Sequence, residues 1–359
     1  MERSELIEKI KKIAPGTPLR HALDDIQDAN VGGLLFFVDD YKKYSHLMQI
    51  GFLLNCQFNP NKLYELAKMD GAIVVDDDLT TIVGANVQLI PDHTIPTNQT
   101  GMRHRAAERM AKETGRMLVA ISKRRNTMTI FLGDFAYTLN NVETLTSKIT
   151  QTIRTAEKYK EAFIEALQGI EFMERTGSLT LYDVVKTIQK GLMVALICEE
   201  AEFTIAELGN HGRFPSMQLA EILVNVNEEI ESLILDFYEE LLDQDSLEEV
   251  FDKMRSLGEK EISSFGVILR NLGYDINTAS QAVEYFIRSR GIRFARHIPR
   301  IPLQVAINLG KEFGTFSNLL ESSEDELKDV DGIGEKRASA IRHAIDVYKK
   351  SGEITVPGF

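Results

Sequence analysis

Residues 100–109 read TGMRHRAAER and bring three nitrogen-bearing side chains to the expected start of a helix. Thr100 is a suitable N-cap, and the alanine-rich run after it favours helix until Gly115. The first backbone N–H groups of a helix have no partner within the helix, so they form a site for anions. Because successive residues diverge by about 100°, Arg103 and His104 share one half of the helix surface. The spacing predicts an anion held at this end of the helix.

Arg105 in the same stretch has two interpretations. It points away from Arg103, and Glu108, three residues further on, or Glu65 elsewhere in the chain would neutralise it. The sequence leaves open whether Arg105 is structural or contacts the ligand.

Two further stretches carry residues suited to phosphate chemistry. Asp70-Gly71 follows a short helical pattern and precedes the apolar run 72–76, which places a carboxylate at the edge of a sheet. Binding of a metal or a ribose hydroxyl would explain it, and so would an ordinary Asp-Gly turn. The hairpin SKRRN (122–126) is either a phosphate clamp or a solvated turn.

Together the three stretches predict a nucleotide ligand. The chain has no P-loop, no Rossmann glycine fingerprint and no kinase signature. The residues therefore indicate phosphate chemistry without naming the reaction.

The C-terminal stretch VDGIGEKRASAI (330–341) is expected to form a tight turn between two helices. Gly332 and Gly334 flank Ile333, and both glycines permit positive φ and leave N–H groups exposed at the start of the next helix. Lys336 and Arg337 would add positive charge. An ordinary helical hairpin is the alternative. The pattern resembles a helix-hairpin-helix motif, and the preceding stretch RIPLQVAINLGKEFGTFSNLL resembles a degenerate second copy of that motif.

The overall composition is typical of a globular protein, with 43% hydrophobic and 26% charged residues. No apolar run reaches the roughly 20 residues that a membrane span needs, and the N-terminus does not resemble a signal peptide. We therefore expect a cytoplasmic protein without membrane contact. The net charge of −13 is unevenly distributed: acids cluster in 228–252, whereas the charged residues of 288–311 are all basic. This asymmetry suggests separate tasks for the two segments.

Periodicity predicts three domains: α/β over 1–140, all-α over 141–287, and small all-α over 288–359. The first domain should contain a central mixed sheet flanked by helices. The second domain should be a helical linker or stalk with its acidic residues on a solvated face. Within the first domain we expect two helices before Gly32, then the strand 34–40, a helix ending near Asp70, strands at 72–76 and 80–90 with an irregularity at Gly84, a helix over 100–115, and a hairpin formed by 117–122 and 127–133.

The motifs KMDGAIV, GMRHRAAER and SKRRN, followed by a helical middle and a helix-hairpin-helix tail, resemble the DisA family of DNA integrity scanning proteins. The resemblance covers essentially the whole chain. It implies a diadenylate cyclase that converts two ATP molecules into cyclic di-AMP and two pyrophosphates, with cyclase domains facing each other in pairs within an octamer. It also implies sequence-independent binding of branched, Holliday-junction-like DNA, association with the nucleoid, and lower cyclase activity on junction DNA.

The resemblance assigns roles to particular residues. It makes Asp70, Arg103 and His104 catalytic, with Asp70 and His104 near a Mg²⁺ or Mn²⁺ ion. The DNA contacts would come from Gly332, Ile333, Gly334, Lys336 and Arg337. The residues that would bind ATP or cyclic di-AMP are Gly71, Leu89, Met102, Arg103, Ala106, Ser122, Lys123 and Arg125.

Two positions depart from the pattern of the family. Ala106 stands where threonine is frequent, so a hydroxyl is missing, and Lys123 stands where arginine is common, which keeps the charge but loses bidentate geometry. The alternative function is a DNA-structure sensor whose nucleotide domain binds ATP but is weakly active or inactive.

Overall fold

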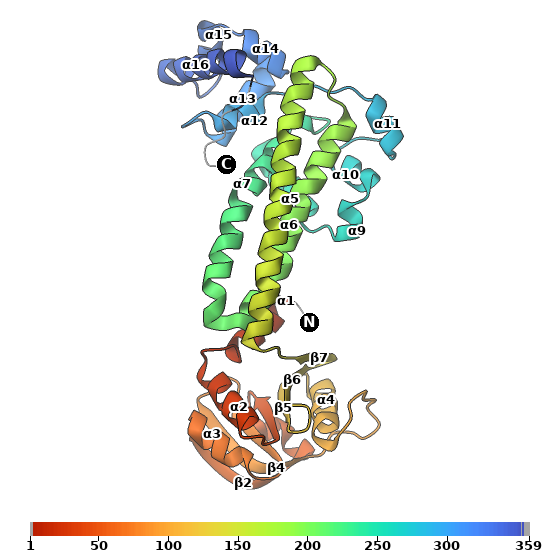
Figure 1. Cartoon of the computed structure of the whole chain (residues 1–359), viewed down its shortest axis with the longest axis vertical. Helices are drawn as coiled ribbons and strands as arrows, with labels where there is room; N and C mark the ends of the chain where they lie inside the picture. Colours follow the sequence, from red (N-terminus) through yellow and green to blue (C-terminus); the bar gives the residue numbers. More distant parts are fainter. Residues whose placement is uncertain (1–2, 353, 355–359) are drawn as a thin grey trace. The chain divides into compact units, whose positions relative to one another are not determined.

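The computed structural model describes residues 3–352 and residue 354 of the 359-residue chain. The backbone forms two compact units, and Figure 1 labels their helices and strands. The first unit consists of Met1–Ile149 and Glu202–Pro215, and the second consists of Thr150–Ala201 and Ser216–Phe359. The predicted boundary near 287 lies inside the second unit, so the division into three domains stays a prediction.

A seven-stranded mixed sheet forms the centre of the first unit, as predicted. Its strand order is β2-β4-β3-β1-β5-β6-β7, and only β1 and β3 pair in parallel. β1 is buried throughout because both faces of the sheet are covered. The strands are β1 Gly33–Val38, β2 Met48–Gln57, β3 Ala72–Asp76, β4 Thr81–Leu89, β5 Met117–Ser122, β6 Thr127–Leu132 and β7 Phe135–Thr138.

Helices lie on both faces of this sheet (Figure 1). On one face, three helices pack onto it through residues that include Ile10, Leu23 and Leu63. On the other face, α4 packs through Ala107 and Met110. The elements of this part of the chain are α1 Arg3–Lys12, α2 Pro18–Asp28, the short helix η1 Tyr41–Leu47, α3 Pro60–Ala67 and α4 Met102–Thr114.

The two outermost strands, β2 and β7, were not predicted from the sequence. Each has a neighbour on one side only, so its side chains do not form the strong apolar pattern of a central strand. On β2, Phe52 and Leu53 are 53% and 55% exposed. The five strands between β2 and β7 were predicted and are confirmed. The predicted irregularity at Gly84 is also present, because the register between β3 and β4 shifts there.

Long helices follow the sheet, as predicted. The described residues include no helix with the length and apolarity to cross a membrane. Apolar residues that recur at helical spacing along α5 are at most 6% exposed: Leu145, Ile149, Ile153, Ala156, Phe163, Leu167 and Ile170. The helices are α5 Val142–Thr176, α6 Leu181–Leu208, η2 Gly209–Gly212, α7 Arg213–Phe237, α8 Gln244–Arg255, α9 Glu259–Ile262, α10 Phe265–Asn271 and α11 Ala279–Glu284.

The prediction of a solvated acidic face is wrong for Glu171, Glu229 and Asp236, whose side chains are buried. Arg293 bridges the two glutamates, with 2.7 Å between its Nη1 and Oε1 of Glu171. Asp236 accepts the backbone N–H groups of Ile292 and Arg293 at 2.7 and 3.0 Å. Glu229 and Asp236 of the acidic segment are therefore engaged by residues of the basic segment inside the second unit, and the separate tasks of the two segments stay a prediction.

Two other arginines of the basic segment are also engaged within the second unit. The guanidinium of Arg290 donates to the carbonyl oxygens of Leu235, Asp236 and Tyr238 at the C-terminal end of α7. A cation is favoured there because it complements the helix dipole and the unpaired carbonyls. Arg296 pairs with a glutamate of the same helix at 3.1 Å. These side chains stabilise the fold and are not free for an external anion.

The last five helices pack around an aromatic cluster of Phe294, Phe316 and Tyr348. The predicted turn between the last two helices is present, and Gly332 has the left-handed φ of 84°. Gly334 has φ −98°, so the expectation of positive φ at both glycines is wrong for the second. The helices are α12 Ile292–His297, α13 Leu303–Phe313, α14 Phe316–Glu321, α15 Glu324–Lys328 and α16 Glu335–Ser351.

Candidate nucleotide-binding site

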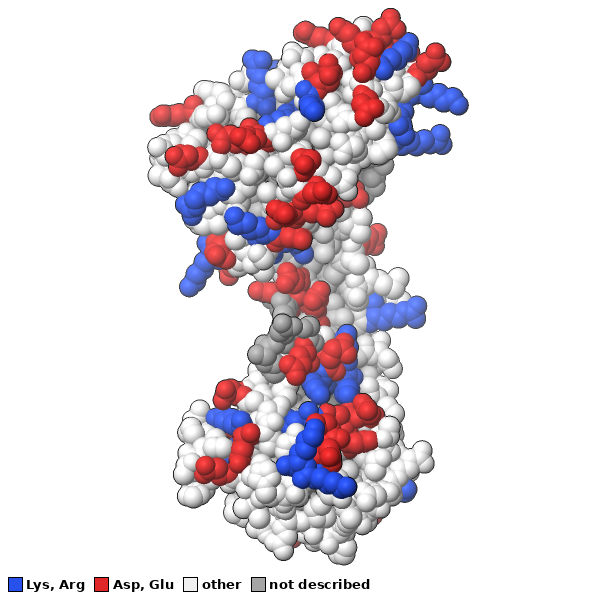
Figure 2. Space-filling model, turned by 180° about the vertical axis from the view of Figure 1, so that it is seen from behind, with Lys and Arg blue, Asp and Glu red and all other residues white. Residues whose placement is uncertain are grey.

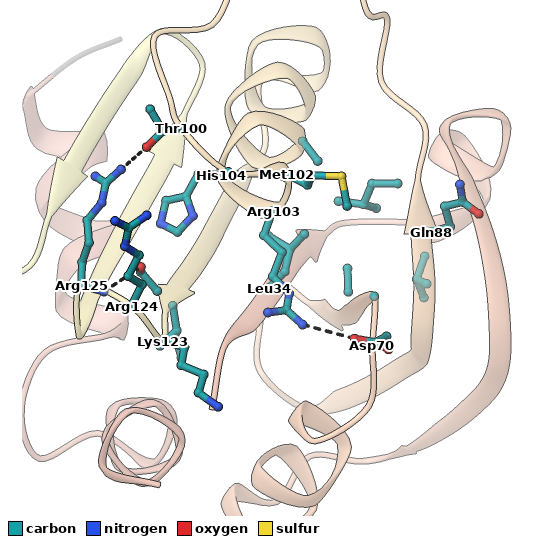
Figure 3. A pocket seen from close by; sticks show the side chains of 18 residues that line it. Leu34, Asp70, Gln88, Thr100, Met102, Arg103, His104, Lys123, Arg124 and Arg125 are labelled. Atoms are coloured by element: carbon teal, nitrogen blue, oxygen red, sulfur yellow. Dashed lines mark hydrogen bonds and ion pairs between the residues drawn. The ribbon is translucent and has the colours of Figure 1, made fainter. Parts of the chain in front are cut away.

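A cavity of about 1150 Å³ lies beside the start of α4 in the first unit (Figure 3). Small-molecule sites usually have volumes of about 300–1,000 Å³, so this cavity is large enough for a nucleotide. The structure brings together on its wall every residue predicted to bind nucleotide or metal, although their roles stay predictions: Asp70, Gly71, Leu89, Met102, Arg103, His104, Ala106, Ser122, Lys123 and Arg125.

The N-terminus of α4 differs from the prediction by one residue. Gly101, with φ 91°, is the N-cap, and no side chain caps the helix there. Thr100 instead accepts a hydrogen bond from Nη2 of Arg125, which lies in the β5–β6 hairpin. The prediction that Thr100 caps the helix is therefore wrong. Its hydroxyl holds a cation at the cavity wall, and the first N–H groups of α4 have no side-chain acceptor at the cap.

Asp70 and Arg103 face each other in the cavity, with 3.5 Å between Oδ1 and Nη2 (Figure 3). The side chain of Asp70 is fully exposed, so water screens this pair and it adds little to stability. Gly71 has φ 85°, and a Cβ there would lie 2.8 Å from the carbonyl oxygen of Val87. Glycine is required for both reasons. The turn therefore presents the carboxylate of Asp70 at the cavity, and this carboxylate contributes little to the stability of the fold.

His104 is 8% exposed and lies edge-on to Phe131. Burial lowers the pKa of the imidazole below its usual value, and the nearby charges of Arg125 and Arg103 lower it further. His104 is therefore mainly neutral at pH 7. Within the described part of the chain, its ring nitrogens have no hydrogen-bond partner. A neutral imidazole of this kind offers one donor and one acceptor, or a metal ligand.

The outer face of α4 holds the loop that connects β4 to this helix. Nε of Arg105 donates to the carbonyl oxygen of Gln99 at 3.1 Å, and Glu108 accepts from the hydroxyl of Thr97. Both acids expected to neutralise Arg105, Glu108 and Glu65, pair with lysines instead. That expectation is wrong, and the structural interpretation of Arg105 is the one that the geometry supports.

The β5–β6 hairpin supplies further positive charge to the cavity. Lys123 and Arg124 are exposed, and neither forms a hydrogen bond or ion pair with the described residues. The backbone N–H of Arg125 donates to Oγ of Ser122 at 3.2 Å, which stabilises the turn. Because these side chains line a cavity, the geometry favours an anion clamp over a solvated turn.

Several cavity residues were missed in the sequence. Leu34, Val87 and Ile121 line the wall, yet in the sequence they are indistinguishable from other apolar strand residues. Gln88 follows Val87 on β4, and its exposed position gives it no apolar signal. Arg124 could have been found, because it lies within the basic run of the hairpin.

Two family models match the chain. Residues 20–135 match the family model DAC, described as DisA bacterial checkpoint controller nucleotide-binding. Residues 139–281 match the DisA bacterial checkpoint controller linker region. The first model ends at residue 135, and the second begins at residue 139.

Curated relatives match along nearly the whole chain. The DNA integrity scanning protein DisA of Thermotoga petrophila is 45% identical over 97% of this chain and 98% of the relative. The protein of that name from Carboxydothermus hydrogenoformans is 38% identical over 99% of this chain and 100% of the relative. The chain belongs to the DisA family, with an N-terminal nucleotide-binding domain of the DAC type followed by the helical linker region of that family.

Proposed function

We propose that this protein is a diadenylate cyclase that condenses two ATP molecules into cyclic di-AMP and two pyrophosphates, and that it also binds branched DNA without sequence preference. The observation that carries the first part is the charge of the cavity. Arg103, Lys123, Arg124 and Arg125 line it together with the single carboxylate of Asp70. A strongly anionic ligand such as a nucleoside triphosphate would compensate this excess of positive charge.

The reaction requires two nucleotides in opposite orientation. In each half-reaction the 3′-oxygen of one ATP forms a bond to the α-phosphorus of the other, the bond from that phosphorus to pyrophosphate breaks, and the hydroxyl proton passes to solvent. The family resemblance implies that each subunit holds one ATP, so we propose that two cavities of facing subunits form the complete site, within the octamer that the same resemblance implies. Such a two-fold arrangement gives both half-reactions the same geometry.

The side chains of the cavity would act mainly by positioning and by charge. Arg103 and Arg125 would stabilise the charge that develops on the phosphate oxygens. Leu89 and Gly71 would form the apolar surface against the base. Thr100 would keep Arg125 oriented through the hydrogen bond that it accepts. Ala106 provides no hydroxyl, so the contact that a threonine would make at this position would be missing.

The residues fit a divalent cation that is bound mainly through the substrate. The described residues contain no group of three or more His, Cys, Asp or Glu side chains that could hold a metal. Mg²⁺ commonly uses one or two carboxylates together with substrate phosphates, and Mn²⁺ accepts similar oxygen ligands. Asp70 would supply the carboxylate, and the neutral His104 could add a nitrogen ligand. When bound, the ion would lower the pKa of the attacking hydroxyl and offset charge on the phosphate.

For DNA binding, the proposal rests on the C-terminal turn. Gly332 and Gly334 do not donate their N–H groups to any acceptor within the described residues, and Lys336 in the first turn of α16 is exposed. Free amides beside a cation suit a backbone phosphate and carry no information about base sequence. On the face in Figure 2, basic and acidic side chains are interspersed.

The first test is incubation of the purified protein with ATP and Mg²⁺ or Mn²⁺, with products resolved by chromatography and mass detection. We expect cyclic di-AMP from the wild type and a loss of at least about 100-fold in Asp70→Asn. Asp134→Asn, an exposed aspartate in the β6–β7 turn, is the matched control and should stay active. ATP that is bound but not converted by the wild type would overturn the cyclase proposal and favour the DNA-structure sensor.

A further inference from the structure

The turn between α12 and α13 has the same backbone arrangement as the turn between α15 and α16. In the first turn, the N–H of Ile301 donates to the carbonyl oxygen of Ile298 at 3.2 Å. In the second turn, the N–H of Ile333 donates to the carbonyl oxygen of Val330 at 3.0 Å. Both central isoleucines are buried, at 9% and 6% exposure. The two turns are therefore structural equivalents, residue for residue.

The equivalence continues into the helix that follows each turn. The N–H of Ala306 donates to the carbonyl oxygen of Pro302 at 3.1 Å, and the N–H of Ala338 donates to that of Gly334 at 3.0 Å. Both alanines are fully buried. Pro302 and Gly334 are thus the N-caps of α13 and α16. The match extends from three residues before each central isoleucine to the first turn of the next helix.

The two turns also lie next to each other. The side-chain amide of Asn308 on α13 donates to the carbonyl oxygen of Asp331 at 3.1 Å. A Cβ on Gly332 would lie 3.0 Å from Cγ2 of Val305 on α13. Because the second turn packs directly against the helix that begins at the first, one extended ligand could reach both turns.

The sequences of the two turns differ at the positions that would contact a phosphate. Pro302 takes the place of Gly334 and has no N–H to donate. Arg300 takes the place of Gly332 and has the same left-handed backbone, with φ 68° against 84°. Arginine adopts this conformation far less readily than glycine. The first turn thus has fewer free amides than the second, and it has a long cation where glycine would be the relaxed choice.

The side chain of Arg300 is free for an external ligand. It is exposed, and among the described residues it forms no hydrogen bond and no ion pair. This distinguishes it from Arg290, Arg293 and Arg296, which are all engaged with α5 or α7.

We propose that Arg300 is the contact of the first turn with a DNA backbone phosphate and replaces the backbone donors that this turn lacks. The two equivalent turns then bind one DNA backbone in different ways, the second through the amides near Gly332 and Gly334 and the first through a guanidinium. A guanidinium suits this role because it binds phosphate oxygens with two parallel N–H groups. The inference rests on the proposed binding of DNA and names a residue that sequence reasoning did not include.

The test is the affinity of the full-length protein for a fluorescent synthetic four-way DNA junction, measured over a series of salt concentrations. Loss of one phosphate contact reduces the slope of log K against log salt by about one. We expect that change in Arg300→Gly, together with about 3–10-fold weaker binding in low salt. The melting temperature should stay within about 2 °C of the wild type or rise, because glycine relaxes the left-handed backbone. Arg300→Lys should retain the slope.

A double variant makes the test specific for the role of the turn. Arg300→Gly combined with Pro302→Gly gives the first turn the glycine pattern of the second, so it should bind more tightly than Arg300→Gly alone. Lys253→Ala, which removes an exposed cation of α8, is the control and should change neither slope nor affinity. A wild type that binds the junction, with Arg300→Gly equal to it in slope and affinity, overturns the inference alone. A wild type that does not bind overturns the proposed DNA binding as well.

Discussion

The arginines of the cavity and the arginines of the α12 region differ in what surrounds them. The side chain of Arg103 is 40% exposed, and its acidic partner within the described residues is the fully exposed Asp70 at 3.5 Å. The side chain of Arg293 is 5% exposed and touches Glu171 and Glu229, both buried. A cluster of cations in a sequence therefore indicates a ligand only where the fold does not bury acids against it.

The two histidines nearest to these arginines show the same contrast. His104 in the cavity has no hydrogen-bond partner within the described residues. His297 places Nδ1 2.7 Å from the carbonyl oxygen of Arg293 and Nε2 2.6 Å from Oε1 of Glu229. The hydrogen bond from His297 and the charge of Arg293 hold the pKa of Glu229 well below its ordinary value, although burial opposes this. The polar groups of the cavity remain accessible to a ligand, whereas the polar groups around Arg293 bind one another in the folded protein.

The largest expected effect comes from breaking the buried site. Arg293→Met leaves Glu171 and Glu229 buried without their common partner, which typically costs about 3–5 kcal/mol. Urea-induced unfolding followed by circular dichroism measures this loss, and limited proteolysis locates it in the second unit.

Lys123→Met is the control for that prediction, because it removes an exposed cation of the cavity that has no acidic partner. Its free energy of unfolding should change by less than about 0.5 kcal/mol. Equal losses in the two variants would contradict the distinction between a saturated and an open cluster.

A smaller effect is expected when a substitution at Gly32 pushes the guanidinium of Arg103 aside and leaves Arg103 itself unchanged. A Cβ on Gly32 would lie 2.5 Å from Nη1 of Arg103, and its other neighbours would be at least 3.4 Å away. Since a long side chain moves easily, Gly32→Ala should leave the fold intact and shift the guanidinium away from Asp70. We expect cyclase kcat/KM to fall about tenfold, or about 1.4 kcal/mol, with the melting temperature nearly unchanged.

The adjacent glycine provides the control. A Cβ on Gly33 would meet only the side chains of Ile121 and Ile26, at 3.4 Å or more. Gly33→Ala should therefore retain full kcat/KM. A Gly32→Ala enzyme as active as Gly33→Ala would show that the position of Arg103 does not matter.

Per unit of pH, the smallest effect is the pH dependence of stability that comes from Glu174 in the second unit. Burial raises the pKa of this carboxyl group to about 7, although Ser289 donates hydrogen bonds to it. Its unfolded pKa is about 4.3, so between pH 4.3 and 7 the folded state binds more protons than the unfolded state. The stability from this group is complete at low pH, falls as pH rises through this window, and is constant above it, with a slope below about 1.4 kcal/mol per pH unit.

Urea midpoints across that pH range should therefore decrease less steeply in Glu174→Gln than in the wild type. Burial also raises the pKa of Asp236, to about 6, so part of the slope should persist in the variant. Parallel curves for the two proteins would exclude Glu174 as the source.

The sequence predicted the central strands and the cavity residues well, for physical reasons. β1 and β3 are covered on both faces and show an unbroken apolar run. Asp70 and Arg103 belong to polar motifs that interrupt an apolar pattern, so they attract attention in the sequence. The cap at Gly101 was missed because a threonine stands beside it. The pairing of Arg293 with Glu171 was missed because the two are far apart in the chain and only tertiary packing joins them.

The exposed edge strand β2 has a consequence for the handling of the protein. Its outer edge leaves main-chain donors and acceptors unpaired within the sheet, and Phe52 and Leu53 are more than half exposed beside them. An unpaired edge with apolar side chains favours addition of another strand. Colloidal stability of the first unit therefore depends on what covers this edge. A fragment that contains only this unit would be prone to self-association at high concentration, although its apolar core is buried.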